Sequence, residues 1–202
     1  MSTQRKLIYN RFNRFWHWSQ ALLILLLALT GFDMRFSLGL FGFENAMDYH
    51  IGVAFAFAVL TVFAIFWHVT TGAWQQYWPL NASRIGAMVR YYTGGIFRNE
   101  PHPIKKTELS KLNPLQRLAY TGLKLFTIPL VVVTGILYYF YNSWEAIGLE
   151  GVELGTMAFL HVLGAYLLLV FTFGHIYLTT TGHTPLSNIK AMITGWEDIE
   201  EE

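Results

Sequence analysis

The chain has 202 residues, of which 53% are hydrophobic and only 13% are charged, a composition too apolar for an ordinary soluble domain. The net charge of +1 and the lack of a basic segment interleaved with aromatic residues exclude a nucleic-acid-binding protein. Cysteine is absent, so the chain offers no thiolates for an iron–sulfur cluster, no C-x-x-C-H site for covalent haem and no disulfide.

Four apolar stretches run through the sequence, and each is long enough to cross the ~30 Å hydrocarbon core of a bilayer. We place these spans at about 15–34, 50–73, 119–141 and 156–181. The first is long, contains a histidine and lacks a small-residue cleavage site, so we interpret it as a retained span rather than a signal peptide. The sequence predicts an all-α integral membrane four-helix bundle that forms a single domain, residues 1–202.

The connections between the spans differ in length and character. The longest, 74–118, contains a predicted surface helix at 82–92 and a glycine-rich break after it. Pro129 is expected to kink the third span. After the fourth span, the amphipathic segment NIKAMITGW precedes the acidic end EDIEEE.

Lys and Arg residues are distributed unevenly among these connections. Four lie in the N-terminal segment and seven in the second connection, whereas the first and third connections together carry only Arg35. Connections rich in Lys and Arg stay in the cytoplasm. We therefore expect both termini and the long second connection to be cytoplasmic in a multi-pass membrane protein.

The fourth span carries two histidines, His161 and His175, which are 14 residues apart. At ~100° and ~1.5 Å of rise per residue, both imidazoles lie on nearly one helix face, roughly 21 Å apart along the axis. Ionisable groups inside a membrane are costly and usually functional. The spacing therefore indicates two metal centres at two depths.

Histidines in the other spans can complete each centre. The predicted topology places His50 and His161 near the outer ends of their spans, and His17 and His175 near the inner ends. Imidazole suits iron, zinc and copper, but zinc usually takes further Cys or carboxylate ligands. Two axial imidazoles with nothing else fit a six-coordinate haem, whose porphyrin supplies four nitrogens. We therefore predict His50 with His161, and His17 with His175, as metal ligands.

His68 leaves one alternative open at the inner centre. It follows His50 by 18 residues, or five helical turns, and so faces the same side roughly 27 Å away. It competes with His17 as the ligand opposite His175. The other interpretation is an interfacial histidine that hydrogen-bonds water, a haem propionate or a carbonyl group.

Several glycines lie where a flat macrocycle would need the backbone to recede. Small residues at helix–helix contacts, which membrane bundles favour, explain these glycines equally well. The five candidates, in or at the ends of spans, are Gly31, Gly52, Gly135, Gly164 and Gly174.

Several segments, taken in order, resemble a known family of membrane cytochromes. They are RFNRFWHWSQALLILLLALTGF in the first span, the H-x-G of the second, KLNPLQRLAY and PLVVVTGILYY around the third, and the paired histidines of the fourth. The chain is similar over essentially its whole length to the four-helix dihaem b-type subunits of formate dehydrogenases, Ni–Fe hydrogenases and thiosulfate reductases.

The resemblance implies an electron conduit with two b haems, the outer held by His50 and His161 and the inner by His17 and His175. Such subunits exchange electrons with an iron–sulfur or multihaem subunit, which serves a catalytic subunit at the outer face. Near the inner face they react with quinone, either menaquinone or ubiquinone. The resemblance also implies a multi-pass protein of a bacterial or archaeal inner membrane.

In the formate dehydrogenase relatives the quinone pocket includes an Asn and a Gln at the start of the third span, which match Asn113 and Gln116. The small Ala-Gly between them in the relatives is Pro114-Leu115 here, which changes the pocket. Asn113 also suits an N-cap followed by proline at the first helical position. Arg14, three residues before His17, is a candidate partner for the haem propionates or else a positive-inside anchor.

We interpret the chain as the quinone-reactive electron-transfer subunit of a respiratory oxidoreductase, without a catalytic site for a soluble substrate. One alternative is a stand-alone quinol-oxidising cytochrome of the b561 type. A different class would be a cofactor-free membrane anchor or a proton-relaying transporter, which an absorbance spectrum without a b-type haem band would support.

Overall fold

A computed structural model of the protein describes residues 3–78, 81–101, 103, 112–182 and 184–200. By its internal contacts the chain divides into two compact units. Unit 1 comprises Met1–Arg14, Trp67–Lys124 and Ile176–Glu202, and unit 2 comprises Phe15–Phe66 and Leu125–His175. The single domain expected for residues 1–202 stays a prediction.

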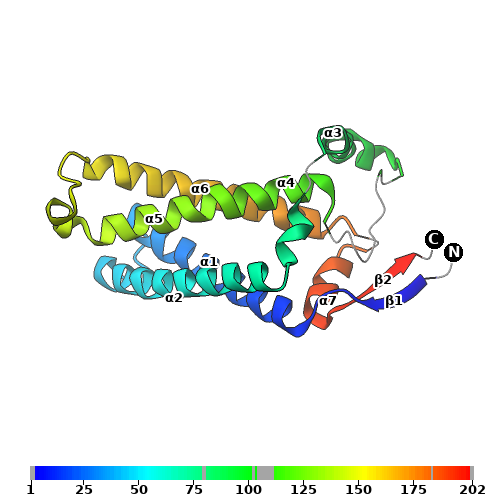
Figure 1. Ribbon diagram of the computed structural model, residues 1–202, viewed down its shortest axis with the longest axis horizontal. Coiled ribbons are helices and arrows are strands. Elements are labelled where there is room, and N and C mark those ends of the chain that lie inside the picture. The colour runs from blue at the N-terminus through cyan, green and yellow to red at the C-terminus, as the bar shows by residue number, and fades with distance from the viewer. Residues whose placement is uncertain (1–2, 79–80, 102, 104–111, 183, 201–202) are drawn as a thin grey trace. The chain divides into compact units, whose positions relative to one another are not determined.

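Among the described residues, four helical segments are long and apolar enough to cross a membrane (Figure 1). They are α1 (Arg11–Phe36), α2 (Phe43–Thr70), the segment Pro114–Tyr139 that contains α4 and α5, and α6 (Leu154–Thr179). The predicted fold class, an all-α integral membrane helical bundle, is confirmed.

The second helix begins earlier than the span boundaries predicted from hydropathy. Helix α2 starts at Phe43, although its first turns contain polar residues, because Gly42 turns the chain with a φ of 77°. Glu44 in the first turn suits the positive end of the helix dipole. The predicted start at residue 50 marked the beginning of the apolar stretch, not of the helix.

The third span changes its helical form close to the predicted kink. Helix α4 (Pro114–Gly122) leads through a π-helical turn, Leu123–Thr127, into α5 (Ile128–Tyr139). Pro129, near the start of α5, has no N–H to donate to the carbonyl four residues earlier. The irregularity therefore lies in the turn directly before the proline, where the wider π-type bonding is found.

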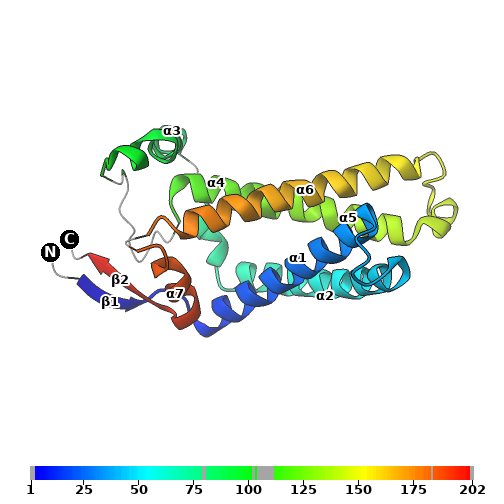
Figure 2. The same cartoon turned by 180° about the vertical axis from the view of Figure 1, so that it is seen from behind.

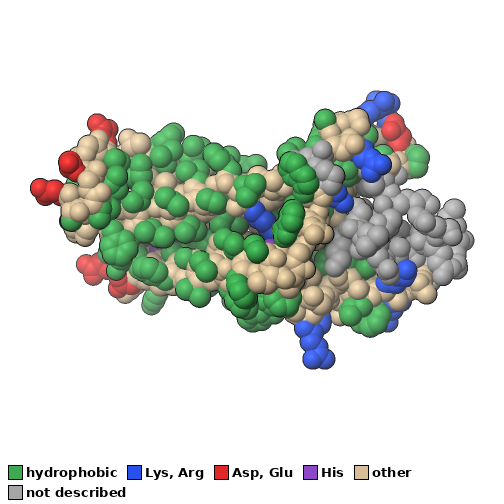
Figure 3. All heavy atoms as spheres, in the orientation of Figure 1, with side chains coloured by type: hydrophobic (Ala, Val, Ile, Leu, Met, Phe, Trp, Pro, Cys, Tyr) green, Lys and Arg blue, Asp and Glu red, His purple; other side chains and the backbone are tan. Residues whose placement is uncertain are grey.

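Unit 2 consists of the membrane-spanning parts of α1, α2, α5 and α6, which run side by side in both ribbon views (Figures 1 and 2). Large apolar side chains point outward along these helices, such as Val59, Val170 and Phe173, which are 70%, 69% and 71% exposed. Figure 3 shows these helices largely covered by hydrophobic side chains. Such a surface is stable against lipid and not against water.

The connection between α1 and α2 is held by one buried carboxylate. Asp33 is 3% exposed and accepts hydrogen bonds from the backbone N–H groups of Leu40 (3.0 Å) and Phe41 (2.9 Å). Hydrogen bonds to a charged acceptor are stronger than those between neutral groups. The carboxylate therefore fixes the loop that sets the starting point of α2, the helix that carries His50.

We expect Asp33→Ala to destabilise the protein by roughly 1.5–3 kcal/mol, because two charge-assisted hydrogen bonds are lost together. The measurement is the thermal unfolding midpoint of the detergent-solubilised protein. Asp48→Ala, at an exposed carboxylate of α2, is the matched control and should leave the midpoint near that of the native chain. Equal midpoints for the two variants would rule out this role for Asp33.

Unit 1 contains a two-stranded antiparallel sheet that the sequence analysis did not predict. Strand β1 (Thr3–Leu7) pairs with β2 (Trp196–Glu200). The register places Lys6 opposite Glu197, and the Arg5 guanidinium lies 5.6 Å from the ring of Trp196. The pairing joins the two ends of the described chain.

Two short helices complete the description of unit 1. The predicted surface helix is present as α3 (Ala82–Arg90), whose N-cap Asn81 accepts a hydrogen bond from the Arg84 N–H. The predicted amphipathic segment forms α7 (Ser187–Thr194), which ends at Gly195 with a φ of 90°. A Cβ atom at Gly195 would lie 2.6 Å from the carbonyl oxygen of Tyr9, so this turn requires glycine.

Candidate functional site

The structure brings the four predicted ligand histidines together in two pairs, all within unit 2. The ring centroids of His50 and His161 are 6.3 Å apart, and those of His17 and His175 are 5.9 Å apart. Two imidazoles bound on opposite sides of one metal ion at ~2.0–2.1 Å have centroids roughly 6 Å apart. Both pairs therefore have the separation that axial ligation of a single ion requires.

The imidazoles of the first pair are each held by a threonine on a neighbouring helix. The Thr30 hydroxyl on α1 lies 2.9 Å from Nδ1 of His50, and the Thr134 hydroxyl on α5 lies 3.2 Å from Nδ1 of His161. Both threonines are buried. The hydrogen bonds engage Nδ1 of each ring and leave Nε2 for a ligand.

The candidate glycines separate into three groups. A Cβ atom at Gly31 would lie 3.5 Å from Cε1 of His50, and one at Gly135 would lie 3.1 Å from Cε1 of His161. At Gly164 a Cβ atom would come within 2.6 Å of a Val131 methyl group, so this glycine serves helix contact. A Cβ atom at either of the remaining two, Gly52 and Gly174, would have open space beside it.

Aromatic rings contact both imidazoles of the second pair. Phe171 stacks on His175 with centroids 5.9 Å apart and planes 5° from parallel, and Trp18 meets His17 edge-on at 5.1 Å. Nδ1 of His17 is buried and has no hydrogen-bond partner among the described residues. A buried imidazole nitrogen without a partner is costly unless the ring is otherwise bound.

These residues fit haem. Across the described ranges, no group of three or more His, Asp or Glu side chains is placed to hold a metal ion, so each pair lacks the further protein ligands that zinc uses. A porphyrin supplies the four equatorial nitrogens itself. A shallow apolar groove on unit 2, lined by Leu23, Phe55 and Val59 among others, includes none of the four histidines.

His68, the alternative inner ligand, lies at the end of α2 within unit 1. Its Nε2 is 3.0 Å from Nζ of Lys124 and 3.4 Å from the hydroxyl of Tyr77, and Lys124 also donates to Tyr77 at 2.6 Å. Burial raises the pKa of Tyr77 above its ordinary value, so its hydroxyl stays protonated. Nε2 of His68 is engaged by these two residues, whereas the ring of His17 faces that of His175, so the geometry favours His17 as the ligand opposite His175.

Asn113 and Gln116 form a reciprocal capping box at the start of α4. The Asn113 side chain accepts from the Gln116 N–H at 2.8 Å, and the Gln116 side chain accepts from the Asn113 N–H at 3.0 Å. The Asn113 amide also donates to the hydroxyl of Tyr92 at 3.2 Å, and burial raises the pKa of Tyr92. The structure therefore shows that Asn113 and Gln116 cap α4. Their contact with quinone stays a prediction.

Asn113→Ala should lower the free energy of unfolding by about 1 kcal/mol, because an N-cap side chain is lost. Asn113→Asp keeps the capping oxygen and removes the amide donor, so it should retain most of that stability. We would measure thermal unfolding and the rate of haem reduction by a quinol analogue. Slower reduction in a normally stable Asn113→Asp protein would assign the amide to quinone, and an unchanged rate would restrict Asn113 to capping.

Arg14, the candidate partner for haem propionates, lies in unit 1. Its Nη1 donates to the carbonyl of Ile193 at 2.8 Å, in the last turn of α7. A cation there stabilises the negative end of the helix dipole. Its Nε is buried and has no hydrogen-bond partner among the described residues. The propionate role stays a prediction.

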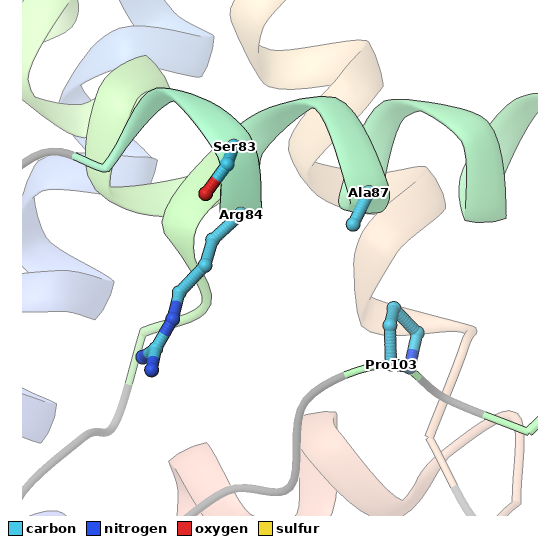
Figure 4. Close-up of a pocket in the computed structure, with 4 residues that line it drawn as sticks. All are labelled: Ser83, Arg84, Ala87 and Pro103. Atoms are coloured by element: carbon cyan, nitrogen blue, oxygen red, sulfur yellow. The ribbon is translucent and has the colours of Figure 1, made fainter.

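A shallow pocket of about 310 Å³ lies beside α3 in unit 1 (Figure 4). The described residues that line it are Ser83, Arg84, Ala87 and Pro103, and none of them is a predicted ligand of haem or quinone. The described lining of this pocket therefore includes none of the paired histidines.

Four apolar helices and two facing pairs of histidines define a membrane-spanning cytochrome of the b type. Residues 8–195 match the prokaryotic cytochrome b561 family, and the chain belongs to that family. It is 30% identical to the Escherichia coli (strain K12) protein named "Putative cytochrome YdhU", over 94% of this chain and 73% of that protein. The protein is therefore a membrane electron-transfer cytochrome, and its family implies haem b as the cofactor.

Proposed function

We propose that the protein is the membrane subunit of a respiratory oxidoreductase and holds two bis-histidine b haems. It would exchange electrons between a redox partner subunit at the outer face and the quinone pool. The observation that carries this proposal is the presence of two imidazole pairs, with centroids 6.3 and 5.9 Å apart, on one bundle. Haem supplies the one-electron redox chemistry when bound.

The chain's own contribution is to hold and separate the two centres. Helix α6 carries one ligand of each pair, so the rise along a continuous helix fixes the separation at roughly 21 Å. The two rings of each pair face one another from neighbouring helices, where neutral imidazoles would bind iron. Neither pair needs to move during electron transfer.

The orientation in the inner membrane is also a proposal. The pairing of β1 with β2 supports placing both termini on the same side, as four spans require. The excess of Lys and Arg in the N-terminal segment and the second connection supports the cytoplasmic side. Outside would then be the end where acidic residues gather on unit 2 (Figure 3), including Glu44, Asp48, Glu145 and Glu150.

The quinone would react at the cytoplasmic side, near the inner haem. Asn113, Gln116 and Tyr92 offer amide and hydroxyl groups that can hydrogen-bond quinone oxygens, and these groups lie in unit 1. The outer partner would be an iron–sulfur or multihaem subunit that serves a catalytic subunit. No residue of the chain is assigned to a soluble substrate, so specificity would reside in that partner.

The haem content of the purified protein tests this proposal. We expect two b haems per chain, with a reduced α-band, and reduction of both by a quinol analogue. One haem or none would contradict the two-centre arrangement. Purification under mild detergent tests the partner: co-purification of iron–sulfur or multihaem subunits supports the respiratory complex. A protein that purifies alone and oxidises quinol would instead be a stand-alone cytochrome.

A further inference from the structure

Thr30 and Thr134 occupy equivalent positions in two different helix pairs of unit 2. Thr30 lies on α1 and meets His50 of α2, and Thr134 lies on α5 and meets His161 of α6. Both hydroxyls also donate to the backbone of their own helix. The Thr30 hydroxyl donates to the carbonyl of Leu26 at 2.8 Å, and the Thr134 hydroxyl to that of Leu130 at 2.5 Å.

This arrangement determines which imidazole nitrogen carries the proton. A hydroxyl group has one proton, and here that proton is committed to a carbonyl oxygen four residues earlier. The hydroxyl oxygen can therefore only accept from the histidine, so Nδ1 must be the N–H donor.

The residue after each threonine gives the imidazole room to reach the hydroxyl. Gly31 and Gly135 face Cε1 of His50 and His161, at the edge of the ring next to Nδ1. A methyl group at Gly135 would stand 3.1 Å from Cε1, closer than ordinary contact. Each Thr–Gly pair thus supplies one hydrogen bond and one close approach to the same ring.

The described contacts of the inner pair are of another kind. Nδ1 of His17 has no hydrogen-bond partner among the described residues, Trp18 meets the His17 ring edge-on, and Phe171 stacks on the His175 ring. The Thr–Gly sequence itself occurs seven times in the chain, so the sequence pattern alone does not create the contact. Its use at His50 and His161 is a property of where α1 and α5 place it.

We propose that Thr30 and Thr134 are positioning residues for one haem, which hold His50 and His161 with a proton on Nδ1 and the Nε2 lone pair directed to iron. An imidazole that donates from Nδ1 is a more basic ligand, and a more basic ligand stabilises ferric over ferrous iron. The two threonines therefore lower the midpoint potential of the haem between His50 and His161 relative to the same site without them. This inference rests on the proposed two-haem function.

The experiment is a potentiometric titration of the purified holoprotein, followed by its visible absorbance. Thr30→Val and Thr134→Val remove the hydroxyl with little change of shape, and the serine variants Thr30→Ser and Thr134→Ser restore it. Thr61→Val is the matched control, because the Thr61 hydroxyl makes the same bond to a carbonyl four residues earlier, at 2.8 Å, and the described residues show no hydrogen bond from it to a histidine.

We expect each valine variant to raise the same one of the two midpoint potentials and to leave the other unchanged. The double valine variant should raise it further. The affected haem should also be lost more readily, by the roughly 10- to 100-fold that removal of such a hydrogen bond usually produces. Both serine variants and Thr61→Val should retain the potentials of the native protein.

Other outcomes separate this inference from the function on which it rests. Unchanged potentials in both valine variants, shifts of different haems, or an equal shift in Thr61→Val would overturn it. If valine removes the haem altogether, retention of haem by serine supports the hydrogen bond and loss in serine overturns it. Fewer than two haems in the native protein would contradict the proposed function instead.

Discussion

His161→Ala should remove one of the two six-coordinate haem signals and leave the other in place. In the proposed arrangement His161 would hold that haem together with His50, whereas His17 and His175 would hold the other. We expect the haem content to fall from two to one per chain and the reduced α-band to fall by about half. His175→Ala should give the same loss at the other centre.

Double substitutions test which histidines share a haem. The double variant His50→Ala with His161→Ala should lose no more haem than either single variant, because both changes affect one centre. His161→Ala with His175→Ala should lose both signals. The pairing would be wrong if His17→Ala retained both haems while His68→Ala lost one, since His68 would then be the inner ligand.

Gly164→Leu should disrupt the contact between α5 and α6 and remove the haem held by His50 and His161. A Cβ atom at this position already meets a methyl group of Val131 at 2.6 Å and the Leu130 side chain at 3.3 Å. Overpacking of this kind usually costs about 1–3 kcal/mol. The helices must separate, which moves Thr134 and Gly135 away from the imidazole of His161.

The measurement combines the thermal unfolding midpoint with the two haem signals. Gly155→Leu is the matched control, because Gly155 lies on the same helix with open space beside it. We expect the control to keep both haems and nearly the native midpoint. A Gly164→Leu protein with both haems at native occupancy would show that the α5–α6 contact can repack.

The sequence was sufficient to predict the four spans and which histidine rings lie near one another, while their role as haem ligands stays a prediction. Long apolar stretches have only one stable secondary structure in a bilayer, and a helix has a fixed rise per residue. The distances between the paired rings agree with that depth matching. The cofactor class followed from the lack of other ligands and agrees with the family to which the chain belongs.

Features that depend on the rotation of one helix against another could not be predicted. Seven Thr–Gly pairs are indistinguishable in the sequence, and only the packing of α1 and α5 shows which two meet histidines. Gly31 faces the ring of His50, whereas Gly164 faces the side chain of Val131, and this difference also depends on how the helices are rotated. The pairing of β1 with β2 was missed because neither short polar segment has a hydrophobic alternation that indicates a strand.

The pairing of β1 with β2 has a consequence for how the protein is made. Strand β1 leaves the ribosome before the four spans, and its partner β2 follows the last of them, more than 180 residues further along the chain. While the spans enter the bilayer one after another, β1 therefore has an open edge. The sheet can close only after all four spans have been synthesised, so its formation comes late in the folding of unit 1.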